Sequence, residues 1–109
     1  MSTIGGMNSN SILPYIDYEA FRKDPKIIIG YSDVTAILLG IYAKTGITTF
    51  YGPALVASFG EFSPFVDNTY DYFKEMLIDD TPIPYEFPMP KFWTEEYIDW
   101  TQQDRGEKG

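Results

Sequence analysis

Neither cysteine nor histidine occurs among the 109 residues of this sequence. The absence of cysteine excludes disulfide bonds and thiolate metal sites. The absence of histidine removes the usual general base for a serine nucleophile and the commonest neutral metal ligand. If the protein is an enzyme, its base is therefore unusual or lies outside these residues. We predict no metal site and no cofactor.

Basic residues are also scarce. The sequence has 8 lysines and arginines against 16 aspartates and glutamates, a formal net charge of -8. Binding to a phosphate backbone requires a basic face, so we predict no nucleic acid partner. No apolar run approaches the roughly 18 residues that a membrane span needs, and no secretory signal is visible. We therefore predict a cytoplasmic protein without membrane contact.

Apolar residues, by contrast, are plentiful, at 44% hydrophobic and 17% aromatic, which indicates a folded chain. Lys26–Ile29 is a β-branched run without polar alternation, typical of a parallel strand covered on both faces. Gly30–Asp33 interrupts it, and residues 34–45 then have helical periodicity that ends at Gly46. With Ile47–Phe50 as the next strand, this order predicts a βαβ unit and an α/β fold. The apolar stripe of the helix consists of Val34, Ile37, Leu38, Ile41 and Tyr42.

Shorter elements precede this unit. Met1–Ile4 predicts a short strand that ends at the Gly5-Gly6 turn. Residues 8–11 are all good capping residues, so a helical turn is expected to follow them. Asp17 is a candidate N-cap for a helix over Tyr18–Lys23.

The second half of the chain has a different character. Residues 54–64 are loop-like, and Asn68 or Thr69 can cap an amphipathic helix that runs to about Leu77. Beyond it the chain becomes rich in proline and then in aromatic residues.

We predict a domain boundary near residue 80. Residues 1–80 would form the C-terminal part of an N-terminal α/β domain that carries the nucleophile. Residues 81–109 would be a linker and the start of a second domain. Only two or three strands are visible, and a sheet that small would have poorly protected edges. We therefore expect this sequence to be a fragment of a longer protein.

Ser32 lies in the turn between the predicted strand and the predicted helix. A serine hydroxyl becomes an effective nucleophile when it is exposed, approached by a base and close to oxyanion donors. A strand–turn–helix arrangement lifts the side chain above the carboxyl edge of the sheet, beside the free N–H groups of the helix start. The stretch Gly30–Asp33 has the first glycine of a G-x-S-x-G elbow and lacks the second. Taken alone, these residues favour the alternative that Ser32 or Asp33 simply caps the helix.

The Gly5-Gly6 turn is a second candidate for a functional element. Two glycines allow close backbone approach to a ligand and can point N–H groups inward. Together with the Asp33 N–H they could form an oxyanion hole. The alternative is an ordinary turn followed by a helix cap at Asn8 or Ser9.

Four separated segments share their order and spacing with one known family, and they are Gly5–Ser11, Leu13–Asp17, Pro25–Thr35 and Thr49–Pro53. They resemble the LD-carboxypeptidase family of serine peptidases, with Asn8-Ser9-Asn10 closest to its microcin C immunity branch. The resemblance covers about residues 1–80 and extends through Trp100. It implies part of a parallel-sheet, flavodoxin- or amidotransferase-like N-terminal domain. It also implies a Ser-His-Glu hydrolase whose Glu and His come from a later C-terminal domain.

Carried over by this resemblance, Ser32 is the nucleophile. The Asp33 backbone N–H is one oxyanion donor, and the Gly5-Gly6 turn supplies another. Because the chain has no histidine, we predict that these 109 residues alone are nearly inactive.

The resemblance also implies a substrate, either a small peptide or a peptidyl-nucleotide. The family cleaves an amide next to a free carboxylate, or the bond joining an acidic residue to a nucleotide-like moiety. Asn8 and Trp100 are the implied substrate-binding residues, with Phe92 and Trp93 as weaker candidates for stacking on a base. The alternative for Trp100 is a place in a helical stripe that covers a core, since Trp93, Tyr97 and Trp100 have helical spacing.

Other classes of function stay open. The chain could be a non-catalytic α/β module that binds an anion or small molecule at the Gly5-Gly6 loop and the helix N-terminus. It could also be a purely structural or interaction fragment. Exposed aromatic residues make a homodimer possible in either case.

Overall fold

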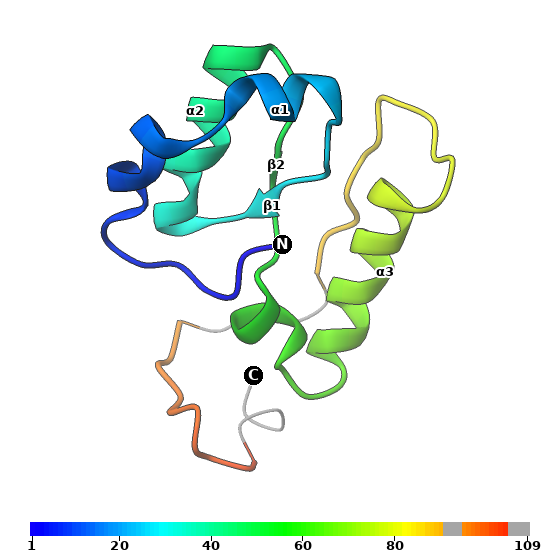
Figure 1. Ribbon diagram of the computed structural model, residues 1–109. Coiled ribbons are helices and arrows are strands. Elements are labelled where there is room, and N and C mark those ends of the chain that lie inside the picture. Colours follow the sequence, from blue (N-terminus) through cyan, green and yellow to red (C-terminus); the bar gives the residue numbers. More distant parts are fainter. Residues whose placement is uncertain (91–94, 105–109) are drawn as a thin grey trace. The chain divides into compact units, whose positions relative to one another are not determined.

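The computed structural model describes residues 1–90 and 95–104 (Figure 1). The chain divides into two compact units, Met1–Gly60 and Glu61–Gly109, and each is described by itself. The domain boundary predicted near residue 80 concerns the longer protein and stays a prediction.

The first unit is built on a small parallel sheet. Strand β1 (Ile29–Gly30) pairs with β2 (Phe50–Tyr51), with Ile29 opposite Phe50 and Gly30 opposite Tyr51. Met1–Ile4 does not form the predicted strand. It is attached to β1 by a single backbone hydrogen bond, in which the Ser2 N–H donates to the Ile29 carbonyl at 2.9 Å. A mixed helical and parallel-strand α/β architecture is therefore confirmed.

The strands are shorter than the sequence predicts and lie slightly later in the chain. Ile27 is 54% exposed, so the isoleucine run is not covered along its whole length. Burial begins at Ile29, which is 5% exposed. A run of β-branched residues signals strand propensity, but the ladder extends only as far as a partner strand is present.

Helix α2 (Thr35–Thr45) follows β1 through a single 3-10 turn, η2 (Ser32–Val34). It contributes Leu38 and Ile41 to the core of this unit, and Val34 of η2, Ile29 of β1 and Ala54 complete that core. Tyr42 is 56% exposed, so the buried stripe is narrower than predicted. Gly46 ends the helix in the left-handed conformation, as predicted, and its N–H donates to the Tyr42 carbonyl at 2.8 Å.

Two short helices pack near α2, namely η1 (Ser9–Tyr15), a 3-10 helix, and α1 (Tyr18–Lys23). The predicted cap of α1 is confirmed, because the Asp17 carboxylate accepts from the Ala20 N–H at 2.9 Å. Gly40 of α2 has no side chain because Leu13 occupies that space: a Cβ there would lie 2.6 Å from Leu13 Cδ2.

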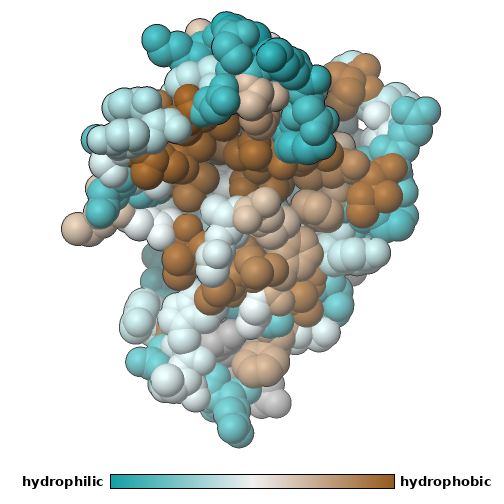
Figure 2. Space-filling model, viewed as in Figure 1, coloured by the Kyte–Doolittle hydropathy of each residue, from teal (hydrophilic) through white to brown (hydrophobic). Residues whose placement is uncertain are grey.

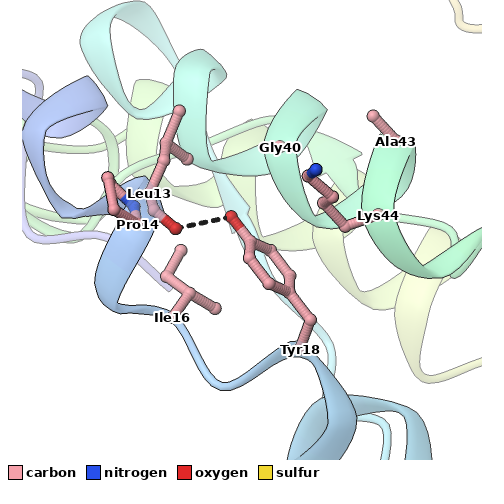
Figure 3. Close-up of a pocket in the computed structure, with 7 residues that line it drawn as sticks. All are labelled: Leu13, Pro14, Ile16, Tyr18, Gly40, Ala43 and Lys44. Carbon is pink, nitrogen blue, oxygen red and sulfur yellow. Dashed lines mark hydrogen bonds between the residues drawn. The ribbon is translucent and has the colours of Figure 1, made fainter.

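A hollow of about 480 Å³ lies between η1, α1 and α2 (Figure 3). Leu13, Tyr18, Gly40 and Lys44 are among its lining residues. The Tyr18 hydroxyl donates to the Leu13 carbonyl at 2.8 Å across it. The hollow is mostly apolar, and none of the predicted site residues lines it.

Residues 54–64 are not all loop, contrary to the prediction. Leu55–Phe59 forms a π-helical turn, η3, in which the Phe59 N–H donates to the Ala54 carbonyl at 3.4 Å. The turn is attached to the N-terminal segment, because the Leu55 N–H donates to the Ser2 carbonyl at 2.9 Å. This long-range pairing has no local signature, so sequence patterns miss it.

The second unit contains helix α3 (Phe65–Leu77), which starts earlier than the predicted Asn68 or Thr69 cap. The cap prediction was wrong because the chain already turns at Phe62, whose carbonyl accepts from the N–H groups of Phe65 and Val66. An aromatic cluster follows the helix, with ring centroids 4.9 Å apart for Tyr85 and Phe87.

The Tyr85 hydroxyl donates to the carboxylate of Glu75 on α3. This hydrogen bond, with some burial, raises the pKa of Tyr85 to about 12. It fastens the proline-rich segment to the helix within the second unit.

Large apolar side chains remain at the surface of the first unit, and Figure 2 shows apolar patches among polar ones on one face. Ile27, Leu39 and Tyr51 are 54%, 62% and 71% exposed. Among residues 1–90 and 95–104, no helix combines the length and apolarity that a membrane crossing requires.

Candidate active site

Ser32 occupies a sharp turn between β1 and α2. Its φ is 58°, which makes it the one non-glycine residue with a left-handed backbone in the part of the chain that the structure describes. Such a conformation costs an L-residue about 1–3 kcal/mol, and residues that hold it cluster at active sites, ligand clamps and switch regions. The Ser32 side chain is exposed. A nucleophile elbow has this geometry: a strained residue that carries its hydroxyl above the end of a strand.

The lack of a side chain at Gly30 allows Ser2 and Val34 to pack closely at the turn that carries Ser32. A Cβ at Gly30 would lie 2.4 Å from Ser2 Oγ and 2.9 Å from Val34 Cγ1, so no larger residue fits there without movement. Val34 stands where the G-x-S-x-G pattern has its second glycine, and it is buried in the core at 9% exposure. The turn therefore needs only the first glycine of that pattern.

The Gly5-Gly6 turn lies directly against this elbow. A Cβ at Gly5 would lie 2.9 Å from Ser32 Oγ and 3.9 Å from the Asp33 backbone nitrogen. A Cβ at Gly6 would lie 3.1 Å from Asp33 Oδ2. The structure thus brings together the two segments that the sequence singled out, although 24 or more residues separate them.

The Asp33 side chain turns toward the glycine segment and not toward the helix. Its Oδ2 accepts from the Ser9 backbone N–H at 2.9 Å. Hydrogen bonds from the Ser9 hydroxyl and from the N–H groups of Ser9 and Asn8 hold the Asp33 pKa below its usual value. A carboxylate that is already hydrogen-bonded and more acidic than usual is a poor general base for Ser32.

The helix-cap alternative for Ser32 and Asp33 was wrong. The N-cap of α2 is Val34 and that of η2 is Tyr31, and neither cap makes a side-chain hydrogen bond. The helix begins without a side-chain cap because the strained turn at Ser32 leads into it directly.

Comparison with known proteins accords with this geometry. Residues 1–52 match the family described as the LD-carboxypeptidase N-terminal domain. Relatives with 65% and 57% identity are aligned over 94% of the chain. The chain belongs to the LD-carboxypeptidase family.

The more similar of these two relatives is a Vibrio cholerae protein that carries a carboxypeptidase assignment. The other is the Microcin C7 self-immunity protein MccF of Escherichia coli. This LD-carboxypeptidase chain spans about 30% of the length of each curated relative. The resemblance drawn from the four sequence segments is therefore confirmed.

Solved structures of MccF have the same fold over this segment. The complex with aspartyl sulfamoyl adenosine matches with a TM-score of 0.84 and 56% identity, covering 94% of this chain and 31% of that one. The complex with glutamyl sulfamoyl guanosine matches with a TM-score of 0.83 and 55% identity, covering 94% and 30%.

Two solved MccF variants add a further correspondence. One is an active-site mutant whose replaced residues include a serine, and the other replaces a tryptophan and was solved with adenosine monophosphate. That serine and that tryptophan are separated by as many residues as Ser32 and Trp100 are in this chain.

The remaining predicted residues of this LD-carboxypeptidase segment are placed less fully. Asn8 is exposed, and its carbonyl accepts from the Ser11 N–H at 3.0 Å and from the Ser11 hydroxyl at 2.7 Å. Its side chain does not cap η1. Trp100 belongs to the second unit and is 47% exposed. Phe92 and Trp93 lie outside the described residues.

Among the residues that the structure describes, two residue classes that often complete an active site are not found beside Ser32. The sequence has no histidine, and within residues 1–90 and 95–104 no group of three or more acidic side chains could hold a metal ion. Sequence reasoning missed the hydrogen bond that the Asp33 side chain accepts from Ser9, because a contact across 24 residues has no local pattern.

Proposed function

We propose that this chain carries the nucleophile, Ser32, of a serine hydrolase that cleaves an amide bond by a Ser-His-Glu mechanism. The observation that carries the proposal is the left-handed φ of 58° at an exposed serine between a parallel strand and a helix. The glycine turn beside Ser32 Oγ supports it, since backbone N–H groups are the usual donors of an oxyanion hole.

The reaction would proceed in two steps. A histidine from outside these residues takes the proton of Ser32 Oγ as the oxygen attacks the scissile carbonyl carbon. The Asp33 N–H and the Gly5-Gly6 turn stabilise the oxyanion, and the leaving amine receives the proton from the histidine as the C–N bond breaks. Water then hydrolyses the acyl-serine ester and regenerates the hydroxyl.

For the substrate we favour an acidic aminoacyl group linked to a nucleotide-like moiety. MccF, which is 57% identical, has been solved with aspartyl and glutamyl sulfamoyl nucleosides. Trp100 would stack on the base, consistent with its separation from Ser32. Asn8 would contact the substrate from the glycine segment. A peptide with a free carboxylate next to the scissile amide, as in cell-wall fragments, is the other candidate.

The context of the site is part of the proposal. We place Ser32 in the last part of a flavodoxin- or amidotransferase-like N-terminal domain that ends near residue 80. The segment after it would lead into the domain that provides the Glu and His. A cytoplasmic location and a homodimer also stay predictions.

A non-catalytic anion-binding module is the second candidate. It would use the same glycine turn and the start of the helical segment, where N–H groups carry partial positive charge. That candidate gives no role to the exposed Ser32 hydroxyl and no reason for the left-handed backbone that carries it. These two features favour the hydrolase.

The test is Ser32→Ala in the full-length parent protein, assayed on an aspartyl sulfamoyl nucleoside and on a cell-wall peptide. We expect kcat to fall about 10⁴-fold or more, because removing the nucleophile leaves only residual catalysis. Ser63→Ala, an exposed serine of the second unit, is the matched control and should leave kcat unchanged. Equal turnover by the Ser32→Ala variant and the wild type would refute the proposal, and binding without turnover by the wild type would favour the module.

A further inference from the structure

Asp33, the residue after the proposed nucleophile, makes a hydrogen bond that is unusual for its position. Asp33 stands at the start of the helical segment, where a carboxylate normally interacts with helix N–H groups. Instead, its Oδ2 accepts from the Ser9 N–H at 2.9 Å, in a segment 24 residues earlier in the chain. The same oxygen lies against Gly6, where a Cβ would approach it to 3.1 Å.

The segment that Asp33 holds is otherwise weakly anchored. Upstream, the Ser2 N–H and the Thr3 carbonyl are bonded to Ile29 and Val56, so the chain is fixed up to Thr3. From Gly6 to Asn8 every residue is exposed, and the Met7 side chain is 91% exposed. Among the hydrogen bonds of the described residues, those accepted by Asp33 are the ones that join this segment to the elbow.

We propose that Asp33 is a positioning residue whose carboxylate clamps the Gly5–Ser9 segment onto the Ser32 elbow, so that the glycine turn is held beside Ser32 Oγ. This inference rests on the proposed hydrolase function. The hydroxyl and the oxyanion donors come from segments far apart in sequence, and hydrolysis requires them within a fraction of an ångström of one geometry. One carboxylate adjacent to the nucleophile fixes that distance.

A carboxylate suits this task better than an amide. It accepts several hydrogen bonds at once, and bonds to a charged acceptor are about twice as strong as neutral ones. Hydrogen bonds from the Ser9 hydroxyl and from the Ser9 and Asn8 N–H groups keep the Asp33 pKa low, so the clamp is charged at neutral pH. An asparagine retains a single acceptor oxygen, and an alanine retains none.

The experiment compares Asp33→Ala, Asp33→Asn and a matched control in the full-length protein. Because oxyanion donors would be misplaced rather than removed, we expect kcat to fall about 10- to 100-fold for Asp33→Ala, with KM within about threefold. For Asp33→Asn we expect a smaller fall, of about 3- to 10-fold. The control is Asp17→Ala, which deletes a carboxylate that also accepts from a backbone N–H at 2.9 Å, but on α1. It should lower the melting temperature and leave kcat unchanged.

Amide hydrogen exchange gives a readout that does not depend on activity. We expect the Ser9 and Asn8 amides to exchange faster in Asp33→Ala and Asp33→Asn, with Ala20 unchanged, and the reverse in Asp17→Ala. If the Asp33→Ala variant does not fold, the kinetics and amide exchange of the Asp33→Asn variant test the proposal on their own. Wild-type kcat in Asp33→Asn together with wild-type protection of the Ser9 amide would overturn the clamp.

The two proposals can fail separately. If the wild type hydrolyses its substrate, Ser32→Ala does not, and both Asp33 variants have the wild-type kcat, the clamp is wrong and the hydrolase stands. If the wild type hydrolyses neither substrate, the hydrolase is wrong, and the catalytic role of Asp33 falls with it.

Discussion

A residue with a left-handed backbone lies near each end of helix α2, but the two residues differ in type. Ser32 just before the helix has a φ of 58°, and Gly46 just after it has a φ of 75°. At the C-terminal end a Cβ on Gly46 would meet nothing within 4 Å. At the N-terminal end Ser32 is crowded, since Gly5 has no room for a Cβ against Ser32 Oγ.

The fold alone explains a glycine at position 46, whereas a serine at position 32 calls for another explanation. Glycine is the usual residue where a helix ends in the left-handed region, because it adopts that conformation without strain. Glycine would serve equally well at position 32 if the fold were the only constraint. A serine there keeps a strained backbone, which is explained if its hydroxyl is needed. The pairing of strain with a crowded, exposed hydroxyl therefore supports the N-terminal end as the candidate site.

The largest expected effect on activity comes from replacing Ser32 by glycine, so that both ends of α2 have a glycine with a left-handed backbone. Ser32→Gly should abolish hydrolysis by the full-length protein, with kcat falling about 10⁴-fold or more. It should also stabilise the protein by up to about 1 kcal/mol, because the left-handed strain is relieved while the unfolded chain gains some entropy. Kinetics and denaturant unfolding of the same preparation measure both effects. A variant that is both inactive and less stable than the wild type would contradict the strain argument.

A smaller loss of activity is expected from crowding the elbow further. In Gly5→Ala the new methyl group would lie 2.9 Å from Ser32 Cβ and Oγ, so either the serine or the turn must shift. We expect kcat to fall about 10²- to 10³-fold, comparable to the loss of one oxyanion donor. Steady-state kinetics check this value.

The control for Gly5→Ala is Gly60→Ala, at a glycine outside the elbow whose Cβ would lie 2.3 Å from the Val56 carbonyl oxygen. It creates a backbone clash of at least equal severity, so it should reduce stability without a specific loss of kcat in the folded protein. If both substitutions had the same effect on kcat, the crowding at Ser32 would have no special role.

How far the sequence predicts the fold depends on the range of the interaction. The Asp17 cap and the Gly46 stop rest on contacts within four residues, and both were correct. The strand limits were wrong because they depend on pairing between residues about 20 positions apart. The π-helical turn Leu55–Phe59 was missed for the same reason, since it is attached to Ser2 and Thr3.

The candidate site follows the same rule. Ser32 and the Gly5-Gly6 turn were each ambiguous as short patterns, and their predicted roles came from their joint occurrence in a family arrangement. Neither the left-handed φ of Ser32 nor the bond from Ser9 to Asp33 can be deduced from residue types. Composition alone predicts one limit on the proposed hydrolase, because a chain without histidine cannot supply an imidazole base.

The smallest expected effect is that of a substitution at Gly46, at the C-terminal end of α2. Gly46→Ala places a Cβ in open space, so the whole effect should be backbone strain, of about 1 kcal/mol of lost stability. Because the Gly46 turn is at the opposite end of the helix from Ser32, kcat and KM should not change. Denaturant unfolding and kinetics of the full-length variant measure the two quantities. If kcat fell in a fully folded Gly46→Ala variant, backbone strain at the C-terminal end of α2 would also affect the Ser32 turn. Ser32 would then no longer distinguish the two ends of the helix.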